Sequence, residues 1–179
     1  PEPAKATMLY AKETPAAGGD TLFASMYLAY DALSEGMKTM LADVKTWSVG
    51  NNFKNNDGID RREVYKGNTQ MANKVRNPGN LVTEAAHPLF RTHPETGRKG
   101  LYIGSHAQTL EGFHEAEAEP IMAFLREHAV QPEFTCRFRW EPGSLALWDN
   151  RCVQHHAVAD YAGQRRRMHR ITICGDKPF

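Results

Sequence analysis

The sequence has few cysteines, and none of them are paired at metal-binding spacing. Cys136, Cys152 and Cys174 are the only three among 179 residues, and they lie far apart. A disulfide framework needs an even set of cysteines, and a cysteine-based zinc module needs C-x-x-C pairs. We therefore expect three reduced thiols in a cytoplasmic protein, which excludes a cystine-rich secreted domain.

Long apolar runs and a charge imbalance are also lacking. No run reaches the roughly 18 apolar residues of a membrane-spanning helix, and the first ten residues lack the pattern of a signal peptide. Lys and Arg number 22 against 21 Asp and Glu, and the arginine run at 165–167 is short. The sequence therefore predicts no membrane partner and no nucleic-acid partner.

The composition that remains is that of one globular domain over residues 1–179. It is 41% hydrophobic and 24% charged, which is ordinary for such a domain. Residues 50–80 differ, because they are rich in Asn and Gly and poor in apolar residues. This stretch predicts a long flexible loop, which is either a lid over an active site or a passive insertion.

The last third of the chain predicts short strands. Residues 143–174 read GSLALWDNRCVQHHAVADYAGQRRRMHRITIC. The apolar run at 144–148 lies between turn signals and predicts a short buried strand, and further strands are expected at 152–158 and 165–174. A helix is expected from Pro120, in its first turn, to about His128. Many short strands with a few helices favour a mostly β sandwich or barrel.

Alternation along the last strand separates its arginines. Arg166 and Arg170 share one face, roughly 13 Å apart, while Arg165 and Arg167 share the other. If the first face lines a barrel interior, each guanidinium needs an anion, since a buried unpaired charge is costly. The pattern then predicts a pocket for two acidic groups. A solvated basic edge strand is an equally open interpretation.

Four ordered motifs resemble one known family. They are GGDTLFA at 18–24, RTHPETGRKGLYIG at 91–104, WDNRxxxHxAxxDY from 148 and QRRxMHRxTxxGDKP from 164. Together they resemble the taurine dioxygenase family of Fe(II)- and 2-oxoglutarate-dependent oxygenases, over nearly the whole chain except about 49–82. The resemblance implies a double-stranded β-helix, or jelly roll, that is mostly β (α+β) with a few flanking helices. It also implies that the N-terminal part of the family fold is missing here.

The resemblance implies that His155 is an iron ligand and hence a catalytic residue. An isolated histidine is usually not a ligand, so this assignment depends on the surrounding motif. The family's other two ligands form a His-x-Asp motif shortly before GGDT, and this sequence contains none. It has a His-x-Glu at His93 and Glu95, in a turn-like stretch that we interpret as a decoy. Either the chain begins just after the missing motif, which we favour, or it is a degenerate relative that holds no iron.

The resemblance also implies three binding residues. Arg166 pairs with the distal carboxylate of 2-oxoglutarate, Thr21 donates its hydroxyl to the same carboxylate, and Arg170 grips the anionic head of the substrate. Thr21 could equally be an ordinary strand threonine.

The activity implied is hydroxylation, with O₂, of a small organic anion: taurine or another alkylsulfonate, a sulfate ester, or an aryloxyalkanoate. Succinate and CO₂ are released. The alternatives are a non-catalytic jelly roll that binds an organic anion, and a hydroxylase of the same fold for an amino-acid-like substrate. The oligomeric state is open, and a homo-oligomer is compatible with the sequence.

Overall fold

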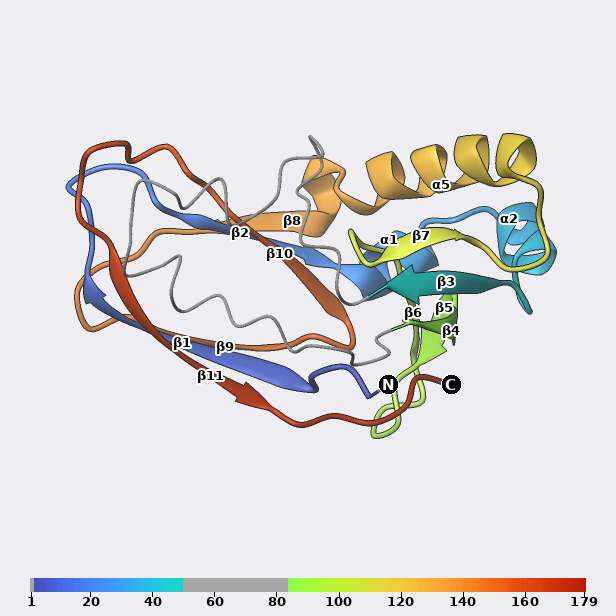
Figure 1. Ribbon diagram of the computed structural model, residues 1–179, viewed down its shortest axis with the longest axis horizontal. Helices are drawn as coiled ribbons and strands as arrows, with labels where there is room; N and C mark the ends of the chain where they lie inside the picture. Colours follow the sequence, from blue (N-terminus) through green and yellow to red (C-terminus); the bar gives the residue numbers. More distant parts are fainter. Residues whose placement is uncertain (1, 50–83) are drawn as a thin grey trace.

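A computed structural model describes residues 2–49 and 84–179 (Figure 1). The expected lid at 50–80 lies outside these residues. The helices and strands in chain order are β1 (Ala6–Glu13), β2 (Thr21–Ser25), α1 (Met26–Asp31), α2 (Glu35–Met40), β3 (Lys45–Val49), β4 (Glu84–Pro88), β5 (Phe90–Thr92), β6 (Lys99–Leu101), β7 (Ala107–Leu110), α5 (Glu115–Ala129), the 3₁₀ turn η1 (Pro132–Phe134), β8 (Thr135–Phe138), β9 (Leu145–Asp149), β10 (Val153–Ala157) and β11 (Arg167–Ile173).

Two three-stranded antiparallel sheets, β11-β1-β9 and β10-β2-β8, form one end of the molecule. Figure 1 shows them one below the other on the left, with the β4-β3-β7 sheet and the helices on the right. The ring of Trp148 on β9 lies 5.2 Å from Phe23 on β2 and 4.8 Å from His155 on β10. The two sheets therefore face each other, and the mostly β prediction is confirmed.

The hydrophobic core lies beside these facing sheets, where α1 packs against β6 and α5 packs against β7. The helix α1 begins where Ser25 accepts a hydrogen bond from the backbone N–H of Leu28, a normal N-cap. None of the described helices is long and apolar enough to cross a membrane. The core consists of Ala24, Met26, Ala29, Leu33, Leu41, Leu89, Phe90, Leu101, Ile103, Ala107, Leu110, Ala118, Met122, Leu125 and Ala129.

The start predicted for the long helix is wrong. Helix α5 begins at Glu115, so Pro120 lies in its second turn rather than its first. The backbone N–H of His114 donates to the carboxylate of Glu117 at 2.9 Å, which completes a capping box. The helix also buries Met122 and Leu125 in the core. This cap and this packing outweigh the single backbone hydrogen bond that Pro120 cannot make.

The strand predicted at 144–148 exists as β9, but it is buried on one face only. Trp148 is 7% exposed, whereas Leu145 and Leu147 are 57% and 61% exposed. Side chains alternate along a strand, and only the face bearing Trp148 meets the opposite sheet. The prediction of a fully buried strand is therefore wrong, because an apolar run alone does not show how many faces are covered.

Candidate functional site

The pairing of β11 with β1 decides which face of β11 looks inward. Arg170 lies opposite Leu9, and Leu9 lies opposite Ala146 of β9. Ala146 shares its strand face with the inward-facing Trp148. Arg170 therefore belongs to the inner face of the sheet, and its neighbour His169, opposite the exposed Tyr10, to the outer face.

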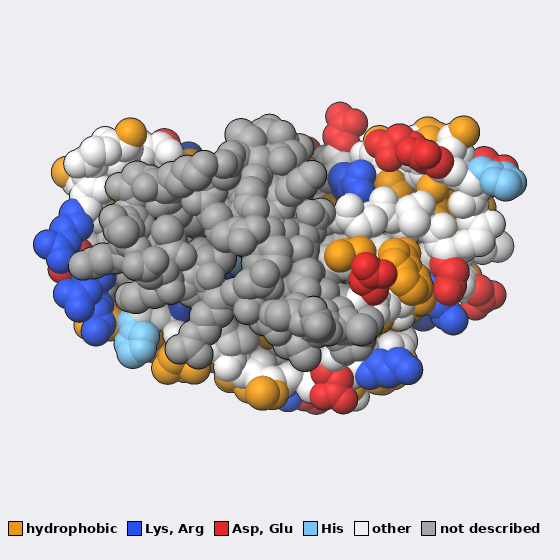
Figure 2. All heavy atoms as spheres, in the orientation of Figure 1, with side chains coloured by type: hydrophobic (Ala, Val, Ile, Leu, Met, Phe, Trp, Pro, Cys, Tyr) orange, Lys and Arg blue, Asp and Glu red, His pale blue; other side chains and the backbone are white. Residues whose placement is uncertain are grey.

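The other two arginines of the run lie at the surface. The side chains of Arg165 and Arg167 are 77% and 58% exposed, and both form ion pairs with Glu13. Figure 2 shows Lys and Arg side chains gathered at the left end of the molecule, over the end of β1 and the start of β11. One face of this segment, with Arg165 and Arg167, is therefore solvated and basic, whereas Arg166 and Arg170 belong to the other face.

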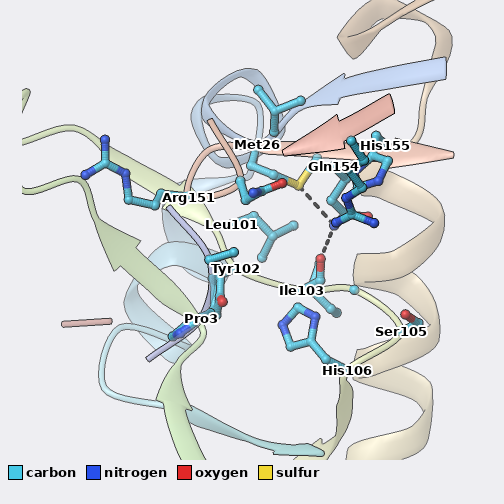
Figure 3. A pocket seen from close by; sticks show the side chains of 15 residues that line it. Pro3, Met26, Leu101, Tyr102, Ile103, Ser105, His106, Arg151, Gln154 and His155 are labelled. Carbon is cyan, nitrogen blue, oxygen red and sulfur yellow. Dashed lines mark hydrogen bonds between the residues drawn. The ribbon is translucent and has the colours of Figure 1, made fainter. Parts of the chain in front are cut away.

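A cavity of about 270 Å³ lies between elements that are far apart in the sequence. His155 of β10, Arg170 of β11 and His106 of the β6–β7 loop line it, together with Pro3 and Ala4. Figure 3 shows His155 on one side and Tyr102, Ile103 and His106 on the other. The side-chain amide of Gln154 donates to the carbonyl of Ile103, which ties β10 to the opposite wall.

The ring of His155 lies at the cavity wall, partly covered by its neighbours, although the residue as a whole is exposed. Its pKa is lowered, first by burial and then by the positive charge of Arg170 and the neighbouring His156. Its ring packs against Trp148 at 4.8 Å, which fixes its orientation. His155 pairs with the inward Phe23 and His156 with Leu22, so the two histidines occupy opposite faces. A neutral imidazole is the form that binds a metal ion.

Arg166 carries a buried donor that has no acceptor among the described residues. Its Nε donates to the carbonyl of Gly19 at 3.1 Å, while its Nη2 is buried and unbonded. Gly19 has φ 71°, and a Cβ there would lie 3.0 Å from Cδ of Arg166. Glycine therefore suits this position, because other residues rarely adopt this φ and a Cβ would crowd the side chain of Arg166. A buried guanidinium N–H without an acceptor is costly, so the position fits an anionic ligand such as a carboxylate.

Thr21 lies at the same turn and is 2% exposed. Its Oγ1 accepts a hydrogen bond from Nε1 of Trp140 at 2.9 Å. Trp140 was not among the residues predicted for the site. Its only signal was that buried tryptophan N–H groups normally find a partner, and this partner is 119 residues away in the chain.

Arg170 differs from Arg166, because it is exposed. Within residues 2–49 and 84–179, no ion pair joins it to another side chain. Of the two arginines, Arg166 is half-buried and its buried Nη2 lacks an acceptor among the described residues, whereas Arg170 is exposed and its charge can be solvated. Arg170 lines the same cavity as His155 and is free to meet a charged group there.

The His-x-Glu motif lies in a separate hydrogen-bonded cluster. Nδ1 of His93 accepts the N–H groups of Glu95 and Thr96, so its Nε2 carries the proton and donates to Asp149 at 3.2 Å. Arg151 donates to both Asp149 and Glu95. Ligand atoms of His93, Asp149 and Cys152 lie within 4.8 Å of one another. Both oxygens of Asp149 are already bonded, so this cluster joins the β5–β6 turn to β9 rather than holding a metal.

Replacing Arg151 with Met should destabilise the protein by about 3 kcal/mol, because the partly buried carboxylate of Asp149 would lose its charged partner. Burial would raise the pKa of Asp149, but hydrogen bonds from Arg151 and His93 lower it to about 2. A lowered carboxyl pKa adds stability above the unfolded-state value of 3.8, and this is lost as the pH falls to about 2. Urea unfolding should therefore show the loss of unfolding free energy in Arg151→Met at pH 7, and a smaller loss near pH 2.

The matched control is Arg165→Met, at an exposed ion pair, which should lower the free energy of unfolding by less than about 1 kcal/mol. Equal losses in both variants would contradict this account.

Two facing antiparallel sheets that place a histidine and an arginine on the wall of one cavity are the arrangement of a jelly-roll protein. The family model described as "Taurine catabolism dioxygenase TauD, TfdA family" matches residues 1–172, and the chain belongs to this family.

Two curated relatives have similar sequences. An alpha-ketoglutarate-dependent sulfate ester dioxygenase of Pseudomonas putida is 36% identical over 174 residues, covering 97% of this chain and 56% of the relative. An alpha-ketoglutarate-dependent 2,4-dichlorophenoxyacetate dioxygenase of Cupriavidus pinatubonensis is 37% identical over 173 residues, with coverage of 97% and 56%. The chain thus spans about half the length of the curated relatives it matches.

Solved structures agree with the fold. A taurine dioxygenase from Burkholderia xenovorans superposes with a TM-score of 0.80 at 32% identity, covering 99% of this chain and 54% of that one. The structure of AAD-2 in complex with Mn(II) and N-oxalylglycine also gives 0.80, at 31% identity, with coverage of 99% and 66%. The jelly-roll prediction and the family resemblance are confirmed.

Proposed function

We propose that the chain is part of an Fe(II)- and 2-oxoglutarate-dependent dioxygenase that hydroxylates a small organic anion and releases succinate and CO₂. The observation that carries the proposal is the buried Nη2 of Arg166, which has no acceptor among the described residues. It lies at the turn that also holds the buried hydroxyl of Thr21. Family membership supplies the rest of the support.

Arg166 and Thr21 would hold the distal carboxylate of 2-oxoglutarate. A guanidinium fork matches the two oxygens of a carboxylate, and charge-assisted hydrogen bonds are strong in a site shielded from water. The two residues orient the co-substrate along the interior toward His155, whose strand pairs with that of Thr21.

His155 would supply one ligand for iron, which activates O₂ for attack on a C–H bond when 2-oxoglutarate is bound. Its neutral imidazole fits this role. A non-haem iron site of this kind also needs a second histidine and a carboxylate. The sequence contains no His-x-Asp, so we expect iron to bind weakly to residues 1–179 alone.

Arg170 would select an anionic substrate. It lines the cavity with His155, so a group held by it lies close to the iron ligand. The named substrates of two relatives, a sulfate ester and 2,4-dichlorophenoxyacetate, are both anions. We propose a sulfonate, a sulfate ester or an aryloxyalkanoate as the substrate class, in a cytoplasmic setting that suits the free thiols of Cys136, Cys152 and Cys174.

Replacing Arg170 with Ala should raise the KM for the prime substrate by about 30- to 100-fold, the loss of one charge-assisted interaction. The KM for 2-oxoglutarate should change little, because Arg166 and Thr21 remain. Steady-state assays of succinate release in the complete gene product would measure both constants, with Arg167→Ala on the outer face as the control. An effect confined to 2-oxoglutarate would show that the two arginines have the opposite roles.

One observation favours a second candidate, a non-catalytic protein that binds an organic anion. It is the lack of any His-x-Asp motif in the 179 residues. Incubating the complete gene product with Fe(II), 2-oxoglutarate and a panel of anions separates the two. Succinate formation that depends on one of the anions supports the dioxygenase. Binding of anions without succinate formation supports the second candidate, and turnover of amino acids alone would indicate a hydroxylase of that class.

A further inference from the structure

The hydroxyl of Thr21 is held by a partner that can only donate. The indole N–H of Trp140 donates to Oγ1 at 2.9 Å. A threonine hydroxyl has one proton and two acceptor positions, whereas an indole has a donor and no acceptor. The indole therefore fills one acceptor position of Oγ1 and prevents the hydroxyl proton from pointing toward Trp140. Among the described residues, no acceptor takes that proton.

The surroundings fix this geometry. Trp140 is 5% exposed and Thr21 is 2% exposed. Phe138 pairs with Thr21 across β8 and β2, and its ring packs edge-on against Trp140 at 4.8 Å. Threonine is branched at Cβ, so its χ1 angle has few alternatives in a strand. Neither partner of this hydrogen bond can easily turn away.

The guanidinium of Arg166 is fixed by the same turn. The carbonyl of Gly19 accepts from Arg166 at 3.1 Å, and the N–H of Gly19 donates to Asp160 at 2.7 Å. A Cβ on Gly18 would lie 2.6 Å from the carboxylate oxygen of Asp160, so the turn is closely packed. Two donors, the hydroxyl of Thr21 and Nη2 of Arg166, are thus set by one rigid segment.

We propose that Trp140 is a positioning residue for 2-oxoglutarate: its indole N–H makes the Thr21 hydroxyl an obligatory donor to the distal carboxylate. This inference rests on the proposed function. It also predicts selectivity, because a site that offers only donors accepts an ionised carboxylate and disfavours an amide, whose NH₂ group would meet these donors.

A double-mutant cycle tests the proposal through binding rather than turnover. The affinity of the complete gene product for N-oxalylglycine, with Mn(II) present, is measured by calorimetry in Trp140→Phe, Thr21→Val and the double variant. Thr21→Val should weaken binding about tenfold, the value of one hydrogen bond to a charged group, and Trp140→Phe should weaken it by a smaller factor, because the Thr21 hydroxyl remains but is no longer held as a donor. The double variant should be no weaker than Thr21→Val alone, since Trp140 acts through the hydroxyl. Trp47→Phe, at a partly exposed tryptophan on β3, should leave the affinity unchanged.

Different failures have different meanings. Effects that multiply in the double variant, or a Trp140→Phe protein of normal affinity, would overturn the role of Trp140. Unchanged affinity in Arg166→Gln would instead overturn the proposed function itself.

If Trp140→Phe does not fold, the exchange rate of the Trp140 indole proton, followed by NMR in ¹⁵N-tryptophan-labelled protein, decides the matter. N-oxalylglycine should slow that exchange in the wild type and in Thr21→Ser, which keeps the hydroxyl, because chained hydrogen bonds strengthen one another. Equal exchange with and without the ligand would contradict the proposal.

Discussion

Replacing His155 with Ala should reduce succinate formation by more than about 1,000-fold, because a facial iron site cannot lose a histidine ligand and keep its geometry. The reason is local. His155 faces the interior beside Trp148, its pKa is lowered by burial and by Arg170, and it lines the cavity with that arginine. The measurement is the rate of succinate release by the complete gene product at saturating 2-oxoglutarate.

The matched control for this change is the next residue. His156 lies on the opposite face of β10, where it pairs with Leu22. His156→Ala should therefore keep most of the activity, although it makes the same chemical deletion. Succinate release that persists in His155→Ala would place the iron site elsewhere.

Replacing Arg166 with Ala should raise the 2-oxoglutarate concentration needed for half-maximal turnover by about 100-fold or more. Loss of one partner from a buried, hydrogen-bonded charge pair typically costs about 2–5 kcal/mol. Arg166 would form such a pair with bound 2-oxoglutarate, because its Nη2 is buried and lacks an acceptor among the described residues. The KM for 2-oxoglutarate, measured at saturating prime substrate, gives the result.

Arg165 offers the control for this second prediction. It precedes Arg166 in the chain, but its side chain is 77% exposed and pairs with Glu13. Arg165→Ala should leave the KM for 2-oxoglutarate within about twofold, as expected for an exposed ion pair. Unchanged kinetics in Arg166→Ala would remove this residue from the co-substrate site.

Much of the fold follows from local sequence signals. Alternation from Arg166 to Thr172 separates an inner from an outer face, and the pairing of Met168 to Thr172 with β1 agrees with that division. Ser25 begins α1 as an N-cap should. The turn-like stretch around His93 and Glu95 lies between β5 and β6, which pair as an antiparallel hairpin. These features depend on neighbours in the chain, so the sequence carries them.

Other features depend on contacts that the sequence does not contain in readable form. The apolar run of β9 gives no sign that Leu145 and Leu147 face outward, since that depends on which sheet lies opposite. The start of α5 depends on a capping box and on core packing that outweigh a proline signal. The bond from Trp140 to Thr21 joins two strands brought together only by the fold. For Arg170, the inward face could be predicted, but not its exposure.

The most direct test of the central claim, that the interior binds 2-oxoglutarate on an iron held in part by His155, is an anaerobic titration. Fe(II) and 2-oxoglutarate are added to the complete gene product, to its His155→Ala variant and to the 179-residue chain. The weak visible charge-transfer band of the iron chelate is then recorded. We expect the band in the complete protein, but not in the variant or in the 179-residue chain, because the chain contains no His-x-Asp pair to complete the iron site. A complete protein without the band, or a band that survives in His155→Ala, would contradict the claim and favour an anion-binding protein or a different iron site.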